Sequence, residues 1–161
     1  MNHRRPAIPP QERTPQAQLA EAGVHDLVGY QLAQASLVTN QVFDDLVGRE
    51  GLRRVEFTLL ALVQGNPGVT ARQLARALAV TPPNIALWLE RLEARGLVER
   101  ERSTRDARMQ HVRLTAAGTA LVNDASRRLV EGERAALTTL TAAEHAMLVE
   151  LLHKAALARR G

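Results

Sequence analysis

Five arginines lie within fourteen residues, from position 100 to position 113, on a segment whose alternating pattern predicts two strands joined by a polar turn. Guanidinium groups bind phosphates and the acceptor edge of guanine, so this basic hairpin could contact nucleic acid. In that case Asp106 would orient an arginine at the tip, and Arg105 or Arg108 would enter a narrow minor groove. Nearby acidic residues leave a second interpretation open, a solvated hairpin with cross-strand ion pairs.

Two short amphipathic segments, Thr70–Ala79 and Thr81–Arg95, precede the hairpin. Thr70 begins a capping box with Gln73, and a second threonine stands before a proline in the position expected of an N-cap. About two residues separate the segments, which is the spacing of a helix-turn-helix whose second helix enters the major groove. Taken alone, a pair of short amphipathic helices is also a common packing unit.

The second of these helices should bury one face and expose the other. Asn84 could bond an adenine edge, and Leu87 could touch a thymine methyl group. The Thr81 hydroxyl and the amides at the start of the helix could bind phosphate. The residues of this helix that we expect to contact DNA are Thr81, Pro83, Asn84, Leu87 and Arg91.

Composition restricts the remaining function classes. The chain has 161 residues, 45% of them hydrophobic, with a formal charge of +4 and no cysteine. A disulfide scaffold, a cysteine zinc site and a cysteine nucleophile are therefore excluded. All but one of the 21 basic residues are arginines, which suits phosphate contacts but can equally reflect the base composition of a genome.

No other constellation points to chemistry or to a membrane. His145 and His153 are eight residues apart without a carboxylate four residues from either, so we expect no metal site and no cofactor. No set of catalytic residues stands out, which argues against an enzyme. Because no apolar run reaches the ~18 residues of a membrane span and the N-terminus lacks the apolar stretch of a secretory signal, we expect no membrane partner and a cytoplasmic location.

The segment LERLEARGLVERERSTRDARMQHVRLTAAG, with Arg105-Asp106-x-Arg108 followed by Leu114-Thr115-x-x-Gly118, resembles the MarR family of bacterial winged-helix regulators. The resemblance implies a mainly α winged helix, with about six helices, a small antiparallel β-wing and an intertwined helical dimerisation region. It also implies that Asp106 and Arg108 occupy the wing positions associated with DNA binding. Arg53 departs from the family pattern, because it stands where the family often has Ser or Thr.

This resemblance sets the expected domains. Residues 1–22 would form a flexible arm, residues 53–115 the DNA-binding lobe, and residues 23–52 with 116–161 the dimerisation region. The outer helices carry more apolar residues than one small winged helix can cover, which independently favours a homodimer. Two-fold symmetry would then place the recognition helices about one DNA turn apart, so the expected operator is a pseudo-palindrome with half-sites ~10 bp apart.

Members of such families often release DNA when a small molecule binds, commonly an aromatic anion. The candidates for ligand contact are Tyr30, Arg53, Arg54 and His111. Two of them also have a structural interpretation, Tyr30 as a half-buried core residue and His111 as a surface residue of the wing.

The leading hypothesis is a homodimeric, sequence-specific regulator of transcription, a repressor that binds double-stranded DNA and that a small aromatic or phenolic effector releases. One alternative is a DNA-coating or architectural protein that is indifferent to sequence, for which the basic arm and wing would suffice. Another is a winged helix used only for protein contacts. Competition between promoter duplex and random duplex for the protein distinguishes the sequence-specific regulator from the architectural protein.

Overall fold

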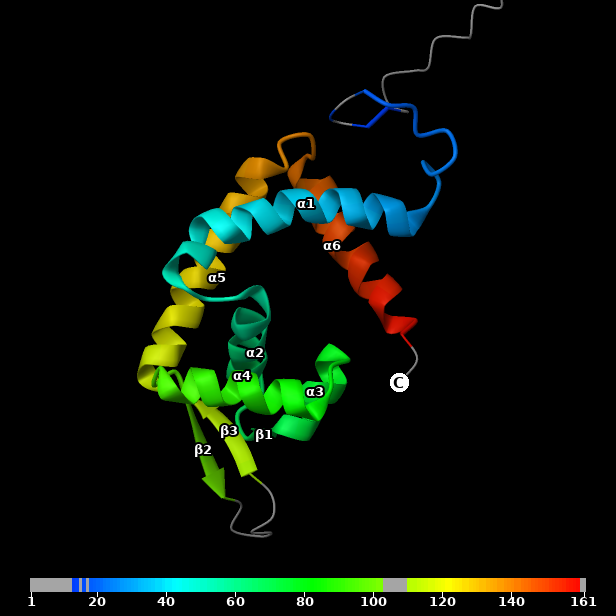
Figure 1. Cartoon of the computed structure of the whole chain (residues 1–161). Coiled ribbons are helices and arrows are strands. Elements are labelled where there is room, and N and C mark those ends of the chain that lie inside the picture. Colours follow the sequence, from blue (N-terminus) through cyan, green and yellow to red (C-terminus); the bar gives the residue numbers. More distant parts are fainter. Residues whose placement is uncertain (1–12, 15, 17, 103–109, 160–161) are drawn as a thin grey trace, which may run out of the picture. The chain divides into compact units, whose positions relative to one another are not determined.

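The computed structural model describes residues 13–14, 16, 18–102 and 110–159, and the chain divides into two compact units, residues 1–40 and 41–161. Figure 1 shows the helices and strands in chain order. The elements are α1 (Val28–Leu46), the 3-10 helix η2 (Gly48–Glu50), α2 (Arg54–Gly65), β1 (Val69–Thr70), α3 (Ala71–Leu78), α4 (Pro82–Ala94), β2 (Val98–Arg102), β3 (Gln110–Leu114), α5 (Ala116–Ala136) and α6 (Ala142–Leu157). None of the helices in the described part of the chain has the length and apolar character needed to cross a membrane.

The first unit contains most of α1 and the segment before it. Glu21 is buried, and its two carboxylate oxygens lie 2.9 Å from the Tyr30 hydroxyl and 3.4 Å from Nδ1 of His25. The hydrogen bond from Tyr30 to Glu21 raises the pKa of the phenol. Backbone turns follow Glu21, and α1 begins at Val28.

The second unit has its core around α2, as the almost uniformly apolar sequence of that helix predicts. Leu59, Leu60 and Val63 of α2 are almost completely buried. They share one cluster with apolar side chains from all the surrounding elements, including Phe43, Ile85, Leu89, Leu92, Val112 and Val122. With so few aromatic residues in the chain, the core is built from interlocking aliphatic side chains.

Helix starts in this unit depend on side-chain caps. Thr70 forms the capping box that the sequence predicts, and Thr141 forms another with Glu144. At α2, however, Arg53 occupies the N-cap position and has no side-chain acceptor to offer. Here the buried Glu56 carboxylate accepts the Arg53 N–H at 3.1 Å, so the third residue of the helix stabilises its start.

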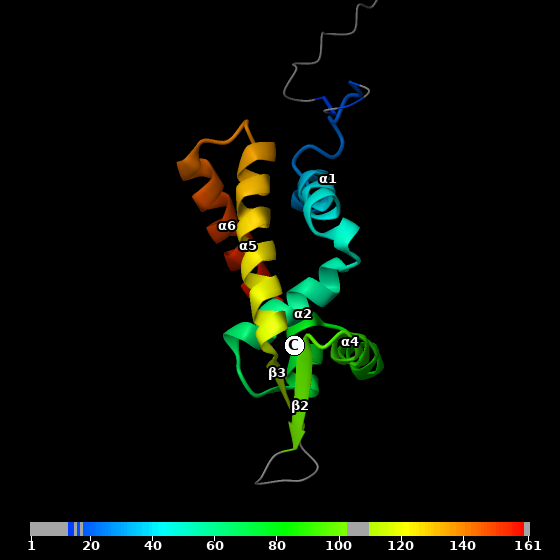
Figure 2. The ribbon, with the colours of Figure 1, turned by 90° about the vertical axis from the view of Figure 1, so that its left-hand side faces the viewer.

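The sheet has one strand more than the predicted hairpin. β2 pairs with β3 in antiparallel register, and β3 also pairs with the two-residue β1, giving the order β1-β3-β2. Val112 in the centre of β3 faces the core, as its alternation with polar neighbours predicts. In Figure 2 the paired strands extend away from the helices, with β2 in front.

Candidate nucleic-acid interface

Helix α4 has one buried apolar face and one exposed face of mixed character. Ile85, Leu89 and Leu92 are at most 1% exposed and fix the helix on the core. All the residues that the sequence predicted for this helix are exposed: Thr81, Pro83, Asn84, Leu87 and Arg91. The structure therefore brings these five positions onto one accessible helix, as a recognition helix requires.

The start of α4 differs from the expected phosphate site. Thr81 is the N-cap residue, but its side chain caps no backbone N–H of the helix. Pro82 and Pro83 have no N–H groups, and the Asn84 N–H already donates to the Thr81 carbonyl at 3.1 Å. The first-turn amides are thus mostly absent, and the prediction that they bind phosphate was wrong in that respect. The Thr81 hydroxyl is the remaining donor from that prediction.

The connection from α3 to α4 is short and strained. Ala79 ends α3 with a φ of 53°, in the left-handed region that favours glycine. The Ala79 N–H donates to the carbonyls of Ala75 and Arg76, and the Val80 N–H donates to Ala75 at 3.1 Å. These bonds hold the turn that sets the direction of the recognition helix.

The end of α4 leads directly into the hairpin. Gly96 has a φ of 66°, and its N–H donates to Glu93 while the Leu97 N–H donates to Leu92, which is the hydrogen-bond pattern of a Schellman motif. This glycine therefore ends the helix. It turns the chain from the recognition helix into β2 within two residues.

Two of the five clustered arginines are occupied by ion pairs. Arg100 is half-buried and lies 3.1 Å from Glu93 of α4, and Arg113 lies 2.9 Å from Glu101 on the neighbouring strand. On these strands the ion-pair interpretation of the hairpin holds. Arg105, Asp106 and Arg108 lie outside the described residues.

His111 lies near the tip end of β3 and joins the hairpin to a distant turn. Its Nδ1 lies 2.6 Å from the Gly68 carbonyl, and because a carbonyl only accepts, this nitrogen carries the proton. His111 thereby ties β3 to the turn before β1. This role as a structural link was not foreseen from the sequence.

The Leu-Thr-x-x-Gly motif at the start of α5 has a steric basis. Thr115 accepts the Gly118 N–H at 3.0 Å and donates its hydroxyl to the Gly96 carbonyl at 2.7 Å. A Cβ atom on Gly118 would lie 2.0 Å from the Leu97 carbonyl oxygen. Only glycine allows α5 to approach the chain this closely where it leaves the recognition helix.

The candidate ligand residues do not form one site. Arg53 and Arg54 line a pocket of about 430 Å³, and Arg54 also pairs with Asp44 and lies over the Phe43 ring at 5.9 Å. His111 is engaged as described, and Tyr30 belongs to the other unit. The described residues include no group of three or more His, Cys, Asp or Glu side chains that could hold a metal ion.

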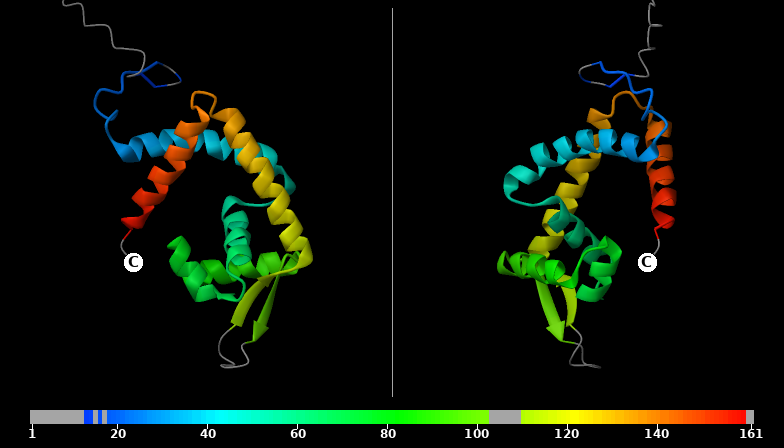
Figure 3. Two further views of the ribbon diagram at one scale, coloured as in Figure 1. Left: turned by 180° about the vertical axis from the view of Figure 1, so that it is seen from behind. Right: turned by 45° about the vertical axis from the view of Figure 1, so that its right-hand side comes forward.

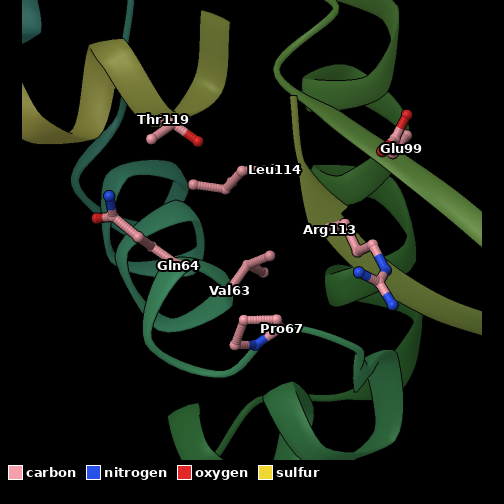
Figure 4. A pocket seen from close by; sticks show the side chains of 7 residues that line it. All are labelled: Val63, Gln64, Pro67, Glu99, Arg113, Leu114 and Thr119. Atoms are coloured by element: carbon pink, nitrogen blue, oxygen red, sulfur yellow. The ribbon is translucent and has the colours of Figure 1, made fainter. Parts of the chain in front are cut away.

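A smaller pocket of about 270 Å³ lies beside the outer face of the sheet. Figure 4 shows Val63 and Leu114 between Gln64 of α2 and Arg113 of β3. Gln64 donates to Asn123 at 2.8 Å, and Arg113 is paired with Glu101. Gln64 and Arg113, two polar residues that line this pocket, therefore already have partners within the chain.

Comparisons with known proteins agree with this architecture. A family model described as MarR family matches residues 50–109. A helix-turn-helix transcriptional repressor of Mycobacterium tuberculosis is 30% identical over 127 residues, covering 79% of this chain and 91% of that protein. The crystal structure of a probable transcriptional regulator from Pseudomonas aeruginosa aligns with a TM-score of 0.70 at 30% identity, covering 81% of this chain and 98% of that one.

A structure of BpsR from Bordetella bronchiseptica aligns with a TM-score of 0.73 at 25% identity, covering 83% of this chain and 96% of that one. The named relatives are regulators of transcription rather than enzymes. Together with the exposed recognition helix, the glycine stop and the hairpin, these matches show that the chain belongs to the MarR family of winged helix-turn-helix transcriptional regulators.

Proposed function

We propose that this protein is a homodimeric repressor that binds a pseudo-palindromic operator. In this proposal, a small aromatic or phenolic acid releases the repressor from DNA. The observation that carries the proposal is α4, whose buried Ile85, Leu89 and Leu92 leave Asn84, Leu87 and Arg91 exposed. In the assigned roles, Asn84 and Leu87 read bases and Thr81 contacts phosphate, with Pro83 and Arg91 beside them. Arg105, Asp106 and Arg108 form the wing contact.

The proposal is tested by selecting an operator from a random duplex library and measuring its affinity at several salt concentrations. Asn84→Ala should reduce discrimination between the selected and random duplexes, because base contacts carry sequence information. Arg108→Ala should lower affinity about tenfold or more and alter the salt dependence. Arg127→Ala removes one exposed charge from α5 and is the matched control. Equal affinity for promoter and random duplex would instead support the architectural alternative.

The proposed dimer rests on apolar side chains at both ends of the chain. On α6, Met147, Val149 and Leu151 are 55%, 58% and 53% exposed, and none of the helix's residues is buried. Val28 and Leu37 of α1 are also exposed. Exposed apolar side chains on these two helices fit contact with a second copy of the chain.

Sedimentation velocity tests the dimer directly. We expect the wild type to sediment as a dimer and Leu151→Glu to shift it toward monomer, because a carboxylate would be buried without a partner. His153→Glu introduces the same charge at an exposed neighbouring position and should leave the dimer intact. A monomeric wild type at micromolar concentration would contradict the proposal.

The proposed release by an effector has two supports. DNA binding by the similar BpsR is described as regulated by 6-hydroxynicotinic acid, an aromatic acid. In this chain, the pocket beside Phe43 is lined by Arg53 and by Arg54, which pairs with Asp44, and guanidinium groups suit a carboxylate ligand. The test is titration of the protein–operator complex with 6-hydroxynicotinate. If 6-hydroxynicotinate releases the wild type from the operator and releases Arg53→Ala less well, this site is supported. If the acid leaves the wild-type complex intact, it is excluded as the effector.

A further inference from the structure

The connection between α1 and α2 is anchored in the core at both ends. Val47 precedes η2 and Leu52 lies just beyond it, and these side chains are 1% and 3% exposed. Between them the chain turns sharply, because Gly51 has a φ of 76° and its N–H donates to the Gly48 carbonyl at 3.0 Å. In Figures 1 and 3 this connection passes beside α5, the yellow helix. Residues 47–52 (the η2 segment) therefore have a fixed position in the second unit.

Glu50, the last residue of η2, fixes this segment to α5. The Arg128 guanidinium donates from Nη1 to the Glu50 carboxylate at 2.7 Å, and its Nε lies 3.1 Å from Asp124, one turn earlier on α5. The Arg128 side chain is 29% exposed, less than either partner, so water and salt screen these contacts less than those of a fully exposed pair. The η2 segment is thus tied to α5 by a guanidinium that two carboxylates share.

Gly51, the next residue, contacts the C-terminal end of α4. The Arg95 guanidinium donates from Nη1 to the Gly51 carbonyl at 3.0 Å. Arg95 is the C-cap residue of α4 and stands immediately before the turn into β2. A recognition helix enters the major groove with its N-terminal residues, so this contact lies at the opposite end of the helix from the expected base contacts. Through two adjacent residues, the η2 segment therefore links α5 to α4.

The direct contacts between α4 and α5 lie together at the start of α5. The Thr115 hydroxyl donates to the Gly96 carbonyl at 2.7 Å, and Gly118 packs against Leu97 beside it. Contacts at one point constrain the distance between two helices more than the angle between them. Arg128 is thirteen residues further along α5 than Thr115, which is about 20 Å at the rise of an α-helix. The η2 segment supplies the second point of attachment, which fixes the angle.

We propose that Glu50 and Arg95 are positioning residues for DNA binding, which set the angle of α4 relative to α5 through the η2 segment and do not contact DNA themselves. In the proposed dimer, α5 lies in the dimerisation region. The link would then determine how each recognition helix is presented to its half-site. Only this consequence rests on the proposed dimer and operator, because the link can be measured in the free protein.

The most informative variant is Glu50→Ala, because charge and positioning predict opposite results for it. Removing a carboxylate makes the protein more basic, which by charge alone should strengthen binding to DNA. We expect the affinity for the selected operator to fall about three- to tenfold instead, and Arg95→Ala to lower it by a similar factor. The slope of log affinity against log salt concentration should stay as in the wild type, because no phosphate contact is removed. Circular dichroism verifies that the variants are folded.

A second measurement follows α4 in the free protein. Trp88, the only tryptophan, is half-buried on this helix, so acrylamide quenching of its fluorescence reports how firmly α4 is packed. Quenching should increase in Glu50→Ala and in Arg95→Ala. In both measurements the double variant should lose little more than either single variant, because the two residues act through one link. Arg95→Lys should restore most of the wild-type behaviour, since an ammonium group can also donate to the Gly51 carbonyl.

Arg49→Ala is the matched control. Arg49 lies in η2 beside Glu50 but pairs with Asp45 of α1, so its loss should leave Trp88 quenching unchanged and lower operator affinity less than Glu50→Ala does. The proposal is overturned if Glu50→Ala binds the operator at least as tightly as the wild type, if Arg95→Ala reduces the salt slope by about one, or if the two substitutions have additive effects. If no operator can be selected, the quenching series decides. Equal quenching in all variants overturns the link, and increased quenching in Glu50→Ala and Arg95→Ala but not in Arg49→Ala supports it.

Discussion

Helices α4 and α6 carry similar apolar residues and use them in opposite ways. In α4, Ile85 and Leu89 are at most 1% exposed, whereas Leu151 and Leu152 of α6 remain 53% and 39% exposed. The first helix is stabilised by packing within its own chain. The second has a capped start, and none of its residues is buried within this chain. An apolar pattern thus predicts a helix but not which molecule covers it.

The largest expected effect is a difference in stability between matched leucine substitutions in these two helices. Leu89→Ala should lower the free energy of unfolding by about 2–5 kcal/mol, because it leaves a cavity in a closed core. Leu151→Ala should leave that value nearly unchanged when the protein is dilute enough to be monomeric, and instead weaken self-association. Urea unfolding followed by the fluorescence of Trp88, the only tryptophan, measures the first effect, and sedimentation measures the second. Equal destabilisation by both substitutions would contradict the contrast.

A smaller effect is expected within α5, at its two glycines. Gly118→Ala should cost about 1–3 kcal/mol, because its Cβ would meet the backbone oxygen of Leu97. Gly132→Ala should be close to neutral. Its Cβ would meet the ends of the Leu46 and Val42 side chains, which can move, and alanine favours the helix by up to ~1 kcal/mol. Thermal unfolding of both variants checks the difference, and a tolerated Gly118→Ala would show that the first turn of α5 is less constrained than its geometry indicates.

The smallest effect concerns the cap of α6. The Thr141 N–H and hydroxyl both donate to Glu144 at 2.8 Å, and these bonds lower the pKa of the carboxyl below its ordinary value. A lowered pKa stabilises the folded helix above the unfolded pKa, and this stabilisation is lost as the pH falls through the folded pKa. Helicity measured by circular dichroism should therefore decline more in the wild type than in Glu144→Gln between about pH 5 and about pH 3. Parallel curves for the two proteins would show that this cap does not contribute.

Local rules account for most of the fold. The caps at Thr70, Thr115 and Thr141 and the stop at Gly96 depend on residues at most a few positions apart, so the sequence is sufficient to place them. The inner face of α4 follows from its periodicity in the same way. A two-residue strand such as β1 has no pattern of its own, and only pairing with a distant strand reveals it.

The candidate site was less predictable, for a physical reason. Which arginine remains available depends on strand register and on neighbours in space, and neither is encoded locally. Arg113 meets Glu101 across the hairpin, and Arg100 meets Glu93 on α4. Arg159 is 83 residues from the carbonyl of Arg76 that it contacts, beyond any sequence motif. The absence of amides at Pro82 and Pro83, by contrast, could have been inferred from the sequence.

The pairing of β1 with β3 has a consequence for how the lobe folds. The hairpin of β2 and β3 closes over a short loop, but His111 and Gly68 are 43 residues apart, with α3 and α4 between them. Because closing a longer loop costs more chain entropy and non-local contacts form more slowly, we expect the third strand to join after the helix-turn-helix is formed. The Val69–Val112 pair would then have a low φ-value, and weakening it should speed unfolding more than it slows folding.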